Sequence, residues 1–310
     1  MPNKSEQESG IPVLGLEDGR FYSYHVTALV TIGASLSCVI AIFWVSFRSH
    51  SYKSFFLWTV SDRFVVYLAT CDGLFNLTHV LDHVQMVVTK SHVYPKGLCV
   101  FYAFLIVVFT TAQALLVLVI ALNSFSLVIL EKTVKFGAYD WRLLIFMFGI
   151  PTAEASVAAF LGQLGPTGSF CGIPGKIALM VMATVPVSLI LVVTCSIYVF
   201  IWCRVRWEIG QLQLSKQSQS WRHSHNAAKI MTLFVTAFVV QWTPISASGI
   251  ISFFGDVPVV LDYLVITCTN MGGVFNGLAF FVIQIMRKRQ KNRVVQPQVV
   301  LLNAETVKPK

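Results

Sequence analysis

Four polar side chains recur at helical spacing inside one apolar stretch, residues 64–88 (FVVYLATCDGLFNLTHVLDHVQMVV). They are Asp72, Asn76, His79 and His83. Steps of four, three and four residues place all of them on one face of a helix, with Asp82 beside the stripe. A carboxylate together with imidazoles and an amide has the chemistry to bind a cation or a hydrogen-bonding ligand, or to exchange protons.

The same stretch is long enough to cross a membrane. As a helix it would span about 37 Å, against a hydrocarbon core of roughly 30 Å. A carboxylate at mid-membrane costs about 2.5–3.5 kcal/mol on insertion scales. We therefore expect the stripe to face other helices and a polar cavity or network, not lipid. The alternative is a purely structural polar contact between helices.

The composition is that of a membrane protein. Of 310 residues, 55% are hydrophobic and 12% are charged, whereas soluble domains carry about 25% charged residues; the mean hydropathy is +0.70. Apolar runs predict membrane helices at 25–47, 64–88, 98–130, 141–162, 176–203, 227–254 and 259–286. We expect an all-α membrane protein, a seven-transmembrane helix bundle over 25–286, with an extracellular segment 1–24 and a cytosolic tail 287–310.

The Lys and Arg residues predict the orientation. With the N-terminus outside and the C-terminus inside, all but five of the 23 fall in cytosolic segments, as membrane proteins prefer. The five outer ones are Lys4, Arg20, Lys90, Lys96 and Lys176. The net charge of +9 should therefore face anionic membrane lipid and cytosolic partners, not nucleic acid. Residues 287–293 (RKRQKNR) predict a short interfacial helix or a simple stop-transfer anchor.

Two of the seven cysteines fall on the outer side in this orientation. Cys99 begins the third apolar run, and Cys171 lies between the fourth and the fifth. Because disulfides persist in oxidising compartments, we expect a bond that ties this loop over the third helix. The alternative is a pair of unbonded thiols.

These features together resemble a G-protein-coupled receptor, and three motifs agree. Residues 68–72 (LATCD) resemble the L-A-x-x-D of the second helix, and 241–244 (QWTP) resemble the C-W-x-P of the sixth, with Gln for Cys. Residues 276–280 (NGLAF) resemble the N-P-x-x-Y of the seventh, with Gly for Pro and Phe for Tyr. The resemblance covers residues 25–293. It implies a multi-pass plasma-membrane receptor that transduces an extracellular small-molecule or peptide ligand to a cytosolic heterotrimeric G protein.

One motif of such receptors is missing. The D-R-Y position along the third helix falls at 123–125 (NSF), so the arginine that contacts the G protein is absent. The segment IALN at 120–123 lies in an apolar run that continues to Leu130 and resembles the corresponding part of the cyclic-AMP-receptor-like branch. A receptor-like membrane protein that does not couple to a G protein therefore remains an alternative.

The resemblance gives the sixth helix a switching role. Pro244 removes a backbone hydrogen bond and kinks that helix. Trp242, less than a turn away, either reports the ligand from the floor of a cavity or packs permanently in the core. We expect the cytosolic half of the helix to swing outward about Pro244 when ligand binds. Asn276 and Phe280 of the seventh helix belong to the same switch.

A polar cluster is expected at mid-membrane from Asp72, Gln113, Asn270 and Asn276. Related receptors hold a sodium ion at such a cluster, and Gln113 falls where the third helix usually offers a hydroxyl. A cation needs oxygen ligands and compensating charge, and Asp72 is the one carboxylate expected at that depth. The alternative is a water-bridged hydrogen-bond cluster without an ion.

The ligand pocket is expected to open outward. Its candidate residues are His79, Asp82, His83, Thr110, Thr111, Glu154 and Trp242. They suit a cationic or strongly hydrogen-bonding ligand, or proton sensing; for each, an inter-helix hydrogen bond is the alternative. Ile106 stands where amine receptors place an aspartate, and 259–286 contains no lysine for a retinal Schiff base. Neither a biogenic amine nor retinal is therefore expected.

Other functions are weighed against the receptor. A seven-helix transporter or channel would use Asp72, His79 and His83 as a proton or substrate path, but no internal repeat indicates one. No metal triad, nucleophile motif or phosphate loop indicates an enzyme. Asn3 fits an N-glycosylation acceptor.

Overall fold

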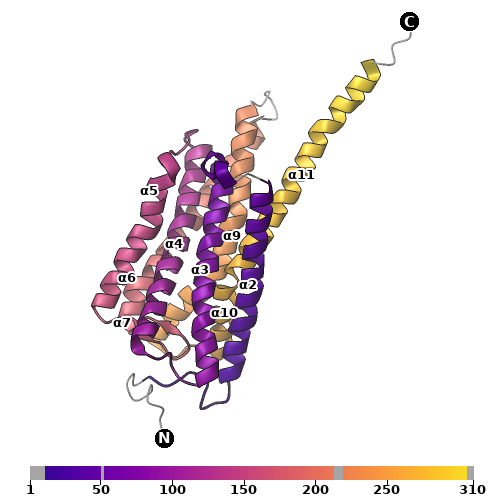
Figure 1. Cartoon of the computed structure of the whole chain (residues 1–310). Helices are drawn as coiled ribbons and strands as arrows, with labels where there is room; N and C mark the ends of the chain where they lie inside the picture. Colours follow the sequence, from indigo (N-terminus) through magenta and orange to yellow (C-terminus); the bar gives the residue numbers. More distant parts are fainter. Residues whose placement is uncertain (1–10, 50–51, 213–218, 306–310) are drawn as a thin grey trace.

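The long helices of the chain lie side by side in one bundle (Figure 1). The computed structural model describes all residues except 1–10, 50–51, 213–218 and 306–310, and only the backbone of 208–212, 219–231 and 289–305. The long helices are α2 (Phe21–Ser49), α3 (Val60–Thr89), α4 (Lys96–Val128), α8 (Val185–Leu212), α9 (Gln219–Phe254), α10 (Val259–Asn270) and α11 (Gly272–Glu305).

The seven predicted membrane helices are confirmed as an all-α bundle. Six helical stretches in the described residues are long and apolar enough to cross a membrane, and α10 with α11 forms a seventh through a 53° bend. The fourth and fifth spans are composite. The fourth joins 138–140, α5 (Trp141–Leu144), a π-helical stretch at 145–149 and α6 (Ile150–Phe160); the fifth joins α7 (Lys176–Leu179), a π-helical stretch at 180–184 and α8.

Prolines explain both π-helical stretches. Pro151 and Pro186 each lie two residues beyond such a stretch. A proline has no N–H for the carbonyl four residues earlier, and its ring clashes with that carbonyl. The carbonyls concerned belong to Met147 and Met182, in the middle of each stretch. The wider π turns accommodate the prolines without ending the span.

The seventh span is bent, where the sequence predicts one uninterrupted run over 259–286. The N–H of Met271 donates to the carbonyls of Thr267 and Cys268, which ends α10. α11 then begins with Gly272, whose backbone lies so close to Asp72 and Gln241 that a β-carbon there would collide with both side chains. The bend therefore presents bare backbone to the polar stripe of α3.

The two central helices are α3 and α4. In the most apolar window of each span, 61% of α3 and 56% of α4 is buried, compared with 28% of α2 and 22% of the fifth span. Asp72, Asn76, His79 and His83 are all buried. The stripe thus faces protein, as its spacing predicts.

One apolar core joins the central helices to α9 and α11. Trp242, Phe234 and Phe238 of α9 are among the largest fully buried side chains. They belong to a cluster that includes Ile120 of α4 and Phe280 of α11. The same α9 residues thus hold the bundle together and precede Pro244, which lies inside that helix.

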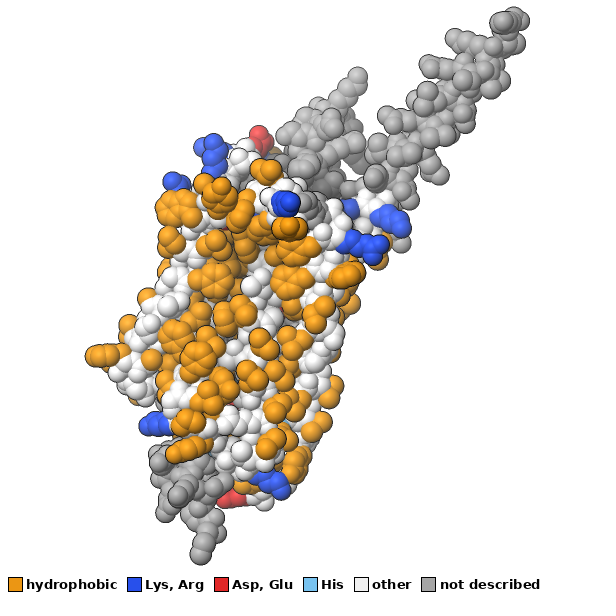
Figure 2. All heavy atoms as spheres, in the orientation of Figure 1, with side chains coloured by type: hydrophobic (Ala, Val, Ile, Leu, Met, Phe, Trp, Pro, Cys, Tyr) orange, Lys and Arg blue, Asp and Glu red, His pale blue; other side chains and the backbone are white. Residues whose placement is uncertain are grey.

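The flank of the bundle is apolar. Figure 2 shows hydrophobic side chains along the face in view, with Lys and Arg near its two ends. Exposed hydrophobic side chains of the bundle as a whole include Trp44, Val88, Phe160 and Val181. Hydrocarbon is a better solvent than water for so much exposed apolar surface, so this surface suits a multi-pass membrane protein.

Loops close one end of the bundle, here called the outer end. β1 (Gly165–Pro166) pairs antiparallel with β2 (Cys171–Gly172) in a hairpin. The expected disulfide is present and joins Cys171 to Cys99 at the start of α4. The N–H of Leu14 donates to the Gly168 carbonyl (2.9 Å), which holds the segment before α2 against the hairpin.

The C-terminal part of α11 leaves the bundle at the end opposite to the start of α2 (Figure 1). An odd number of crossings requires this arrangement. α11 continues as one helix to Glu305. The side chains beyond Lys288 lie outside the described residues, so the interfacial helix of the tail stays a prediction. Asn3, the candidate glycosylation site, also lies outside them.

Candidate functional site

Three histidines gather near the outer end of α2 and α3. Nδ1 of His25 lies 2.7 Å from Nδ1 of His83, a distance at which one ring donates an N–H and the other accepts it. The ring of His79 meets that of His83 edge to face, with centroids 4.9 Å apart. His79 Nδ1 also lies 3.0 Å from Oδ1 of Asn270 in α10. The predicted pair of histidines is therefore part of a contact that joins three helices.

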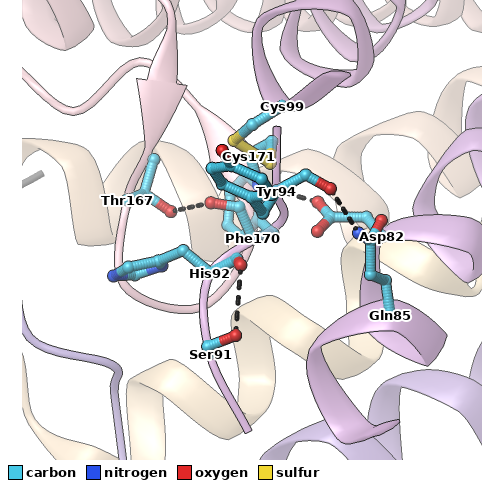
Figure 3. The surroundings of a disulfide bond; sticks show 9 residues. All are labelled: Asp82, Gln85, Ser91, His92, Tyr94, Cys99, Thr167, Phe170 and Cys171. Atoms are coloured by element: carbon cyan, nitrogen blue, oxygen red, sulfur yellow. Dashed lines mark hydrogen bonds between the residues drawn. A yellow bond between two sulfur atoms is a disulfide. The ribbon is translucent and has the colours of Figure 1, made fainter. Parts of the chain in front are cut away.

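Asp82, next to His83 in the sequence, connects α3 to the hairpin. Its Oδ2 accepts the N–H of Cys171 at 2.7 Å (Figure 3). The neighbouring Phe170 packs its ring against His79, with centroids 5.1 Å apart. Because the disulfide fixes Cys171 to α4, the hairpin holds Phe170 inside the mouth of the bundle. Oδ1 of Asp82 and Nε2 of His25 are buried without a protein partner.

The other predicted pocket residues lie elsewhere. Thr111 of α4 is within hydrogen-bond reach of Glu154 in α6, and both side chains are half-buried. Thr110 beside it is half-buried too. Thr111 and Glu154 form a polar pair between α4 and α6, whereas the histidine cluster lies between α2, α3 and α10.

A cavity of about 160 Å³ opens at the outer end, above the disulfide. It is lined by Ile11, His92, Tyr94, Lys96, Leu164 and Pro174, among others. His92 donates from Nε2 to the carbonyl of Ile11 (2.8 Å), which holds Ile11 at the edge of this cavity.

At the entry to α2, the backbone N–H and guanidinium of Arg20 hold the pKa of the Asp18 carboxyl below its usual value.

A further polar group surrounds Asp72 at mid-bundle. Its Oδ1 accepts from Nε2 of Gln113 (2.8 Å) and its Oδ2 from Nδ2 of Asn276 (2.7 Å). Gln113 also donates to Oε1 of Gln241 (3.3 Å), and Gln241 donates to the Thr269 carbonyl (3.2 Å). Three of the four residues predicted for this cluster are thus together; Asn270 instead faces His79.

Ser35 of α2 extends the same group. Asn76 donates to its hydroxyl at 3.1 Å, and the backbone N–H of Gly273 donates to it at 2.9 Å. Sequence reasoning missed Ser35, Gln241 and His25. Gln241 could have been recognised from the QWTP motif, where it replaces Cys. Ser35 and His25 are isolated polar residues in an apolar run, and this pattern does not distinguish a functional site from a polar contact between helices.

An aromatic path runs from the hairpin to the core. Phe75 stacks on His79 with centroids 4.9 Å apart, and meets Trp242 at 6.4 Å. Trp242 in turn lies 6.3 Å from Phe238. It is buried and its Nε1 has no protein partner. Rings therefore lie in contact from Phe170 at the mouth to Trp242, two residues before Pro244.

The far end of the bundle lacks the expected arginine. At the D-R-Y position, Ser124 is buried and its Oγ lies 3.1 Å from the hydroxyl of Tyr198 in α8. The charged contacts nearby lie on α3. Arg63 forms a two-point ion pair with Asp140 (2.6 and 3.0 Å), and Asp62 pairs with Arg287 of α11 (2.6 Å).

The fold is that of a seven-helix membrane protein. The model of the 7 transmembrane receptor (rhodopsin family) matches residues 38–282, well over half of the chain. The protein therefore belongs to the rhodopsin family of seven-transmembrane receptors. It is a receptor by family, not an enzyme.

Comparison with solved structures agrees. The chain is similar to the crystal structure of squid rhodopsin, with a TM-score of 0.66 and 14% sequence identity over 97% of this chain and 91% of that one. At this identity the likeness is one of fold. A comparison with curated protein sequences finds no match.

Proposed function

We propose that the protein is a plasma-membrane receptor, with the outer end outside the cell, that couples an extracellular small-molecule or peptide ligand to a heterotrimeric G protein. The ligand binds at the histidine cluster and Asp82, beneath the hairpin. Binding shifts a two-state equilibrium in which the cytosolic half of α9 swings outward about Pro244.

The aromatic path carries this proposal. Phe170 touches His79, His79 touches Phe75, and Phe75 touches Trp242, so a ligand that moves Phe170 changes the packing around the α9 proline. Close-packed side chains pass on such a displacement because cores have few arrangements of comparable energy. The path therefore supplies the physical link between the outer ligand and the inner end of α9.

The unpartnered atoms define the ligand's chemistry. Oδ1 of buried Asp82 accepts hydrogen bonds, and Nε2 of His25 donates or accepts according to its tautomer. A buried polar atom without a partner is costly, so a ligand that satisfies these atoms gains affinity. The best match is a cationic or strongly hydrogen-bonding group that enters beside Phe170.

The proposed coupling takes place at a cytosolic end that lacks the usual arginine. Ser124 and Tyr198 join α4 to α8 where that arginine would stand, above an apolar contact of Val128 with Ile201. The G protein then meets a surface without an arginine at this position. Lys288 faces anionic lipid at the same end, where Arg287 is paired with Asp62. The absence of the arginine also supports a second candidate, a receptor that binds ligand without coupling.

Nucleotide exchange tests coupling. A ligand is first found by the rise in melting temperature that selective binding to the folded protein causes. The receptor, reconstituted in bilayers, should then accelerate exchange on a purified G protein of at least one class. Phe170→Ala should reduce this response, whereas Phe160→Ala, at an aromatic residue 91% exposed on α6, should not.

Two outcomes would overturn parts of the proposal. A ligand that stabilises the protein but accelerates exchange on no class of G protein would favour the non-coupling receptor. Flux of that ligand into proteoliposomes would instead indicate a transporter.

A further inference from the structure

The rhodopsin-like fold raises the question of a sodium ion beside Asp72. A cation at such a site needs oxygen ligands and a carboxylate with free lone pairs directed at it. The fit therefore depends on which atoms face the Asp72 carboxylate. This question is independent of the proposed ligand and of G-protein coupling.

The groups that face Asp72 are N–H donors. Gln113 directs Nε2 at one carboxylate oxygen and Asn276 directs Nδ2 at the other, at 2.8 and 2.7 Å. Asp72, Gln113 and Asn276 are all buried. Amide hydrogens carry positive partial charge, so they take the electrostatic role of a cation; they do not ligate one.

A backbone carbonyl fixes the orientation of the Gln241 and Gln113 amides. The carbonyl of Thr269 can only accept, so Gln241 must turn its NH₂ group toward it. Oε1 of Gln241 then faces Gln113, which must donate a hydrogen bond from its own NH₂ group. That group is the one that donates to Asp72. Reversing either amide would set two acceptors or two donors against each other.

The backbone also approaches the carboxylate closely. Gly272 at the start of α11 lies against Oδ1 of Asp72 and Nε2 of Gln241, so closely that even a β-carbon would collide with them. A residue without a side chain is needed for this approach. The longer Gln113, in place of a short hydroxyl side chain, reaches into the space that an ion would need.

We infer that the amide of Gln113, oriented by Gln241, takes the place of the cation and that this receptor is independent of sodium. Gln113 and Gln241 are positioning residues. They tie Asp72 of α3 and the start of the α10–α11 bend to α9, one residue before Trp242. The link between these helices is therefore built into the chain and does not depend on the ionic composition outside the cell.

Melting of the full-length purified protein in sodium chloride and in potassium chloride of equal ionic strength tests this. Wild type should melt at the same temperature in both salts. Gln113→Ser removes the amide and opens space, so it should gain a saturable, sodium-specific rise in melting temperature. Adding Asp72→Asn to Gln113→Ser should abolish that rise, because the carboxylate is the counter-charge.

Each contrary result overturns the inference. One is a sodium-specific rise in wild type that Asp72→Asn removes, and this comparison stands even if Gln113→Ser does not fold. The other is a folded Gln113→Ser protein that melts identically in the two salts. Neither measurement involves a ligand or a G protein, so a failure here is distinct from a failure of coupling.

Discussion

The ring of Phe170, on the disulfide-bonded hairpin, packs against the imidazole of His79 in α3 with centroids 5.1 Å apart. The chain thus places one of its own aromatic residues against the histidine cluster at the mouth of the bundle. Access to that cluster and the position of the hairpin are therefore linked.

Asp82 should be needed to seat the hairpin. Asp82→Ala leaves the buried N–H of Cys171 without its acceptor, which should lower the free energy of unfolding by about 1–3 kcal/mol. Asp82→Asn keeps an acceptor oxygen and should cost less. Thermal melting measures both. Gln85→Ala is the matched control, because Gln85 also bonds the outer-loop backbone, by donating to the Tyr94 carbonyl, but that hydrogen bond is exposed. Equal losses for Asp82→Ala and Gln85→Ala would contradict this role.

The ion pair of Arg63 with Asp140 should stabilise the end of the bundle opposite the hairpin. The two side chains are 11% and 5% exposed, so removal of one partner strands a nearly buried charge and should cost about 3–5 kcal/mol. A double-mutant cycle with Arg63→Met and Asp140→Leu should give a double variant more stable than the sum of the single losses predicts. Additive losses would argue against a coupled pair. Arg20→Met, in the exposed pair with Asp18, should leave the melting temperature unchanged.

Gly272 should tolerate no side chain. Gly272→Ala forces a β-carbon against Asp72 and Gln241, and such overpacking costs typically about 1–3 kcal/mol. Gly33→Ala in α2 meets nothing within 4 Å and should leave stability unchanged or slightly higher, since alanine favours the helix. The comparison is made by melting temperature. A Gly272→Ala protein as stable as wild type would mean that the backbone does not press on the Asp72 group.

The bond of Ser124 to Tyr198 should hold α4 to α8. Tyr198→Phe removes one buried hydrogen bond and should cost about 0.5–1.5 kcal/mol in melting experiments. Ser124→Ala should cost a similar amount, and the double variant little more than either single one. Strictly additive losses would show that the two hydroxyls do not depend on each other.

The sequence predicts well those features that depend on local periodicity. The spacing of Asp72, Asn76, His79 and His83 is enough to place all four on the buried face of α3, and the two outer cysteines are enough to predict their bond. Seven apolar runs specify the bundle, because every span must hide its backbone polar groups in a helix.

The partners of these residues were harder to predict, because they come from distant parts of the chain. His25 meets His83 only through the packing of α2 on α3, and Gln241 meets Gln113 only through the crossing of α9 and α4. Nothing in the helical spacing of Asn270 indicates that it faces His79 and not Asp72; the bend at Met271 decides this. Glu154 and Thr111 were both expected in the pocket, but their contact with each other depends on the packing of α6 on α4 and not on the spacing within either helix.

The outward movement of α9 is measured most directly as a distance between spin labels. One label is placed at Leu130 beyond α4 and one at Thr232 in α9, in a variant that lacks the exposed cysteines Cys195 and Cys203. Agonist with G protein should lengthen this distance, and Pro244→Ala should reduce the change. An unchanged distance at saturating agonist and G protein would contradict a receptor that signals through its α9 proline.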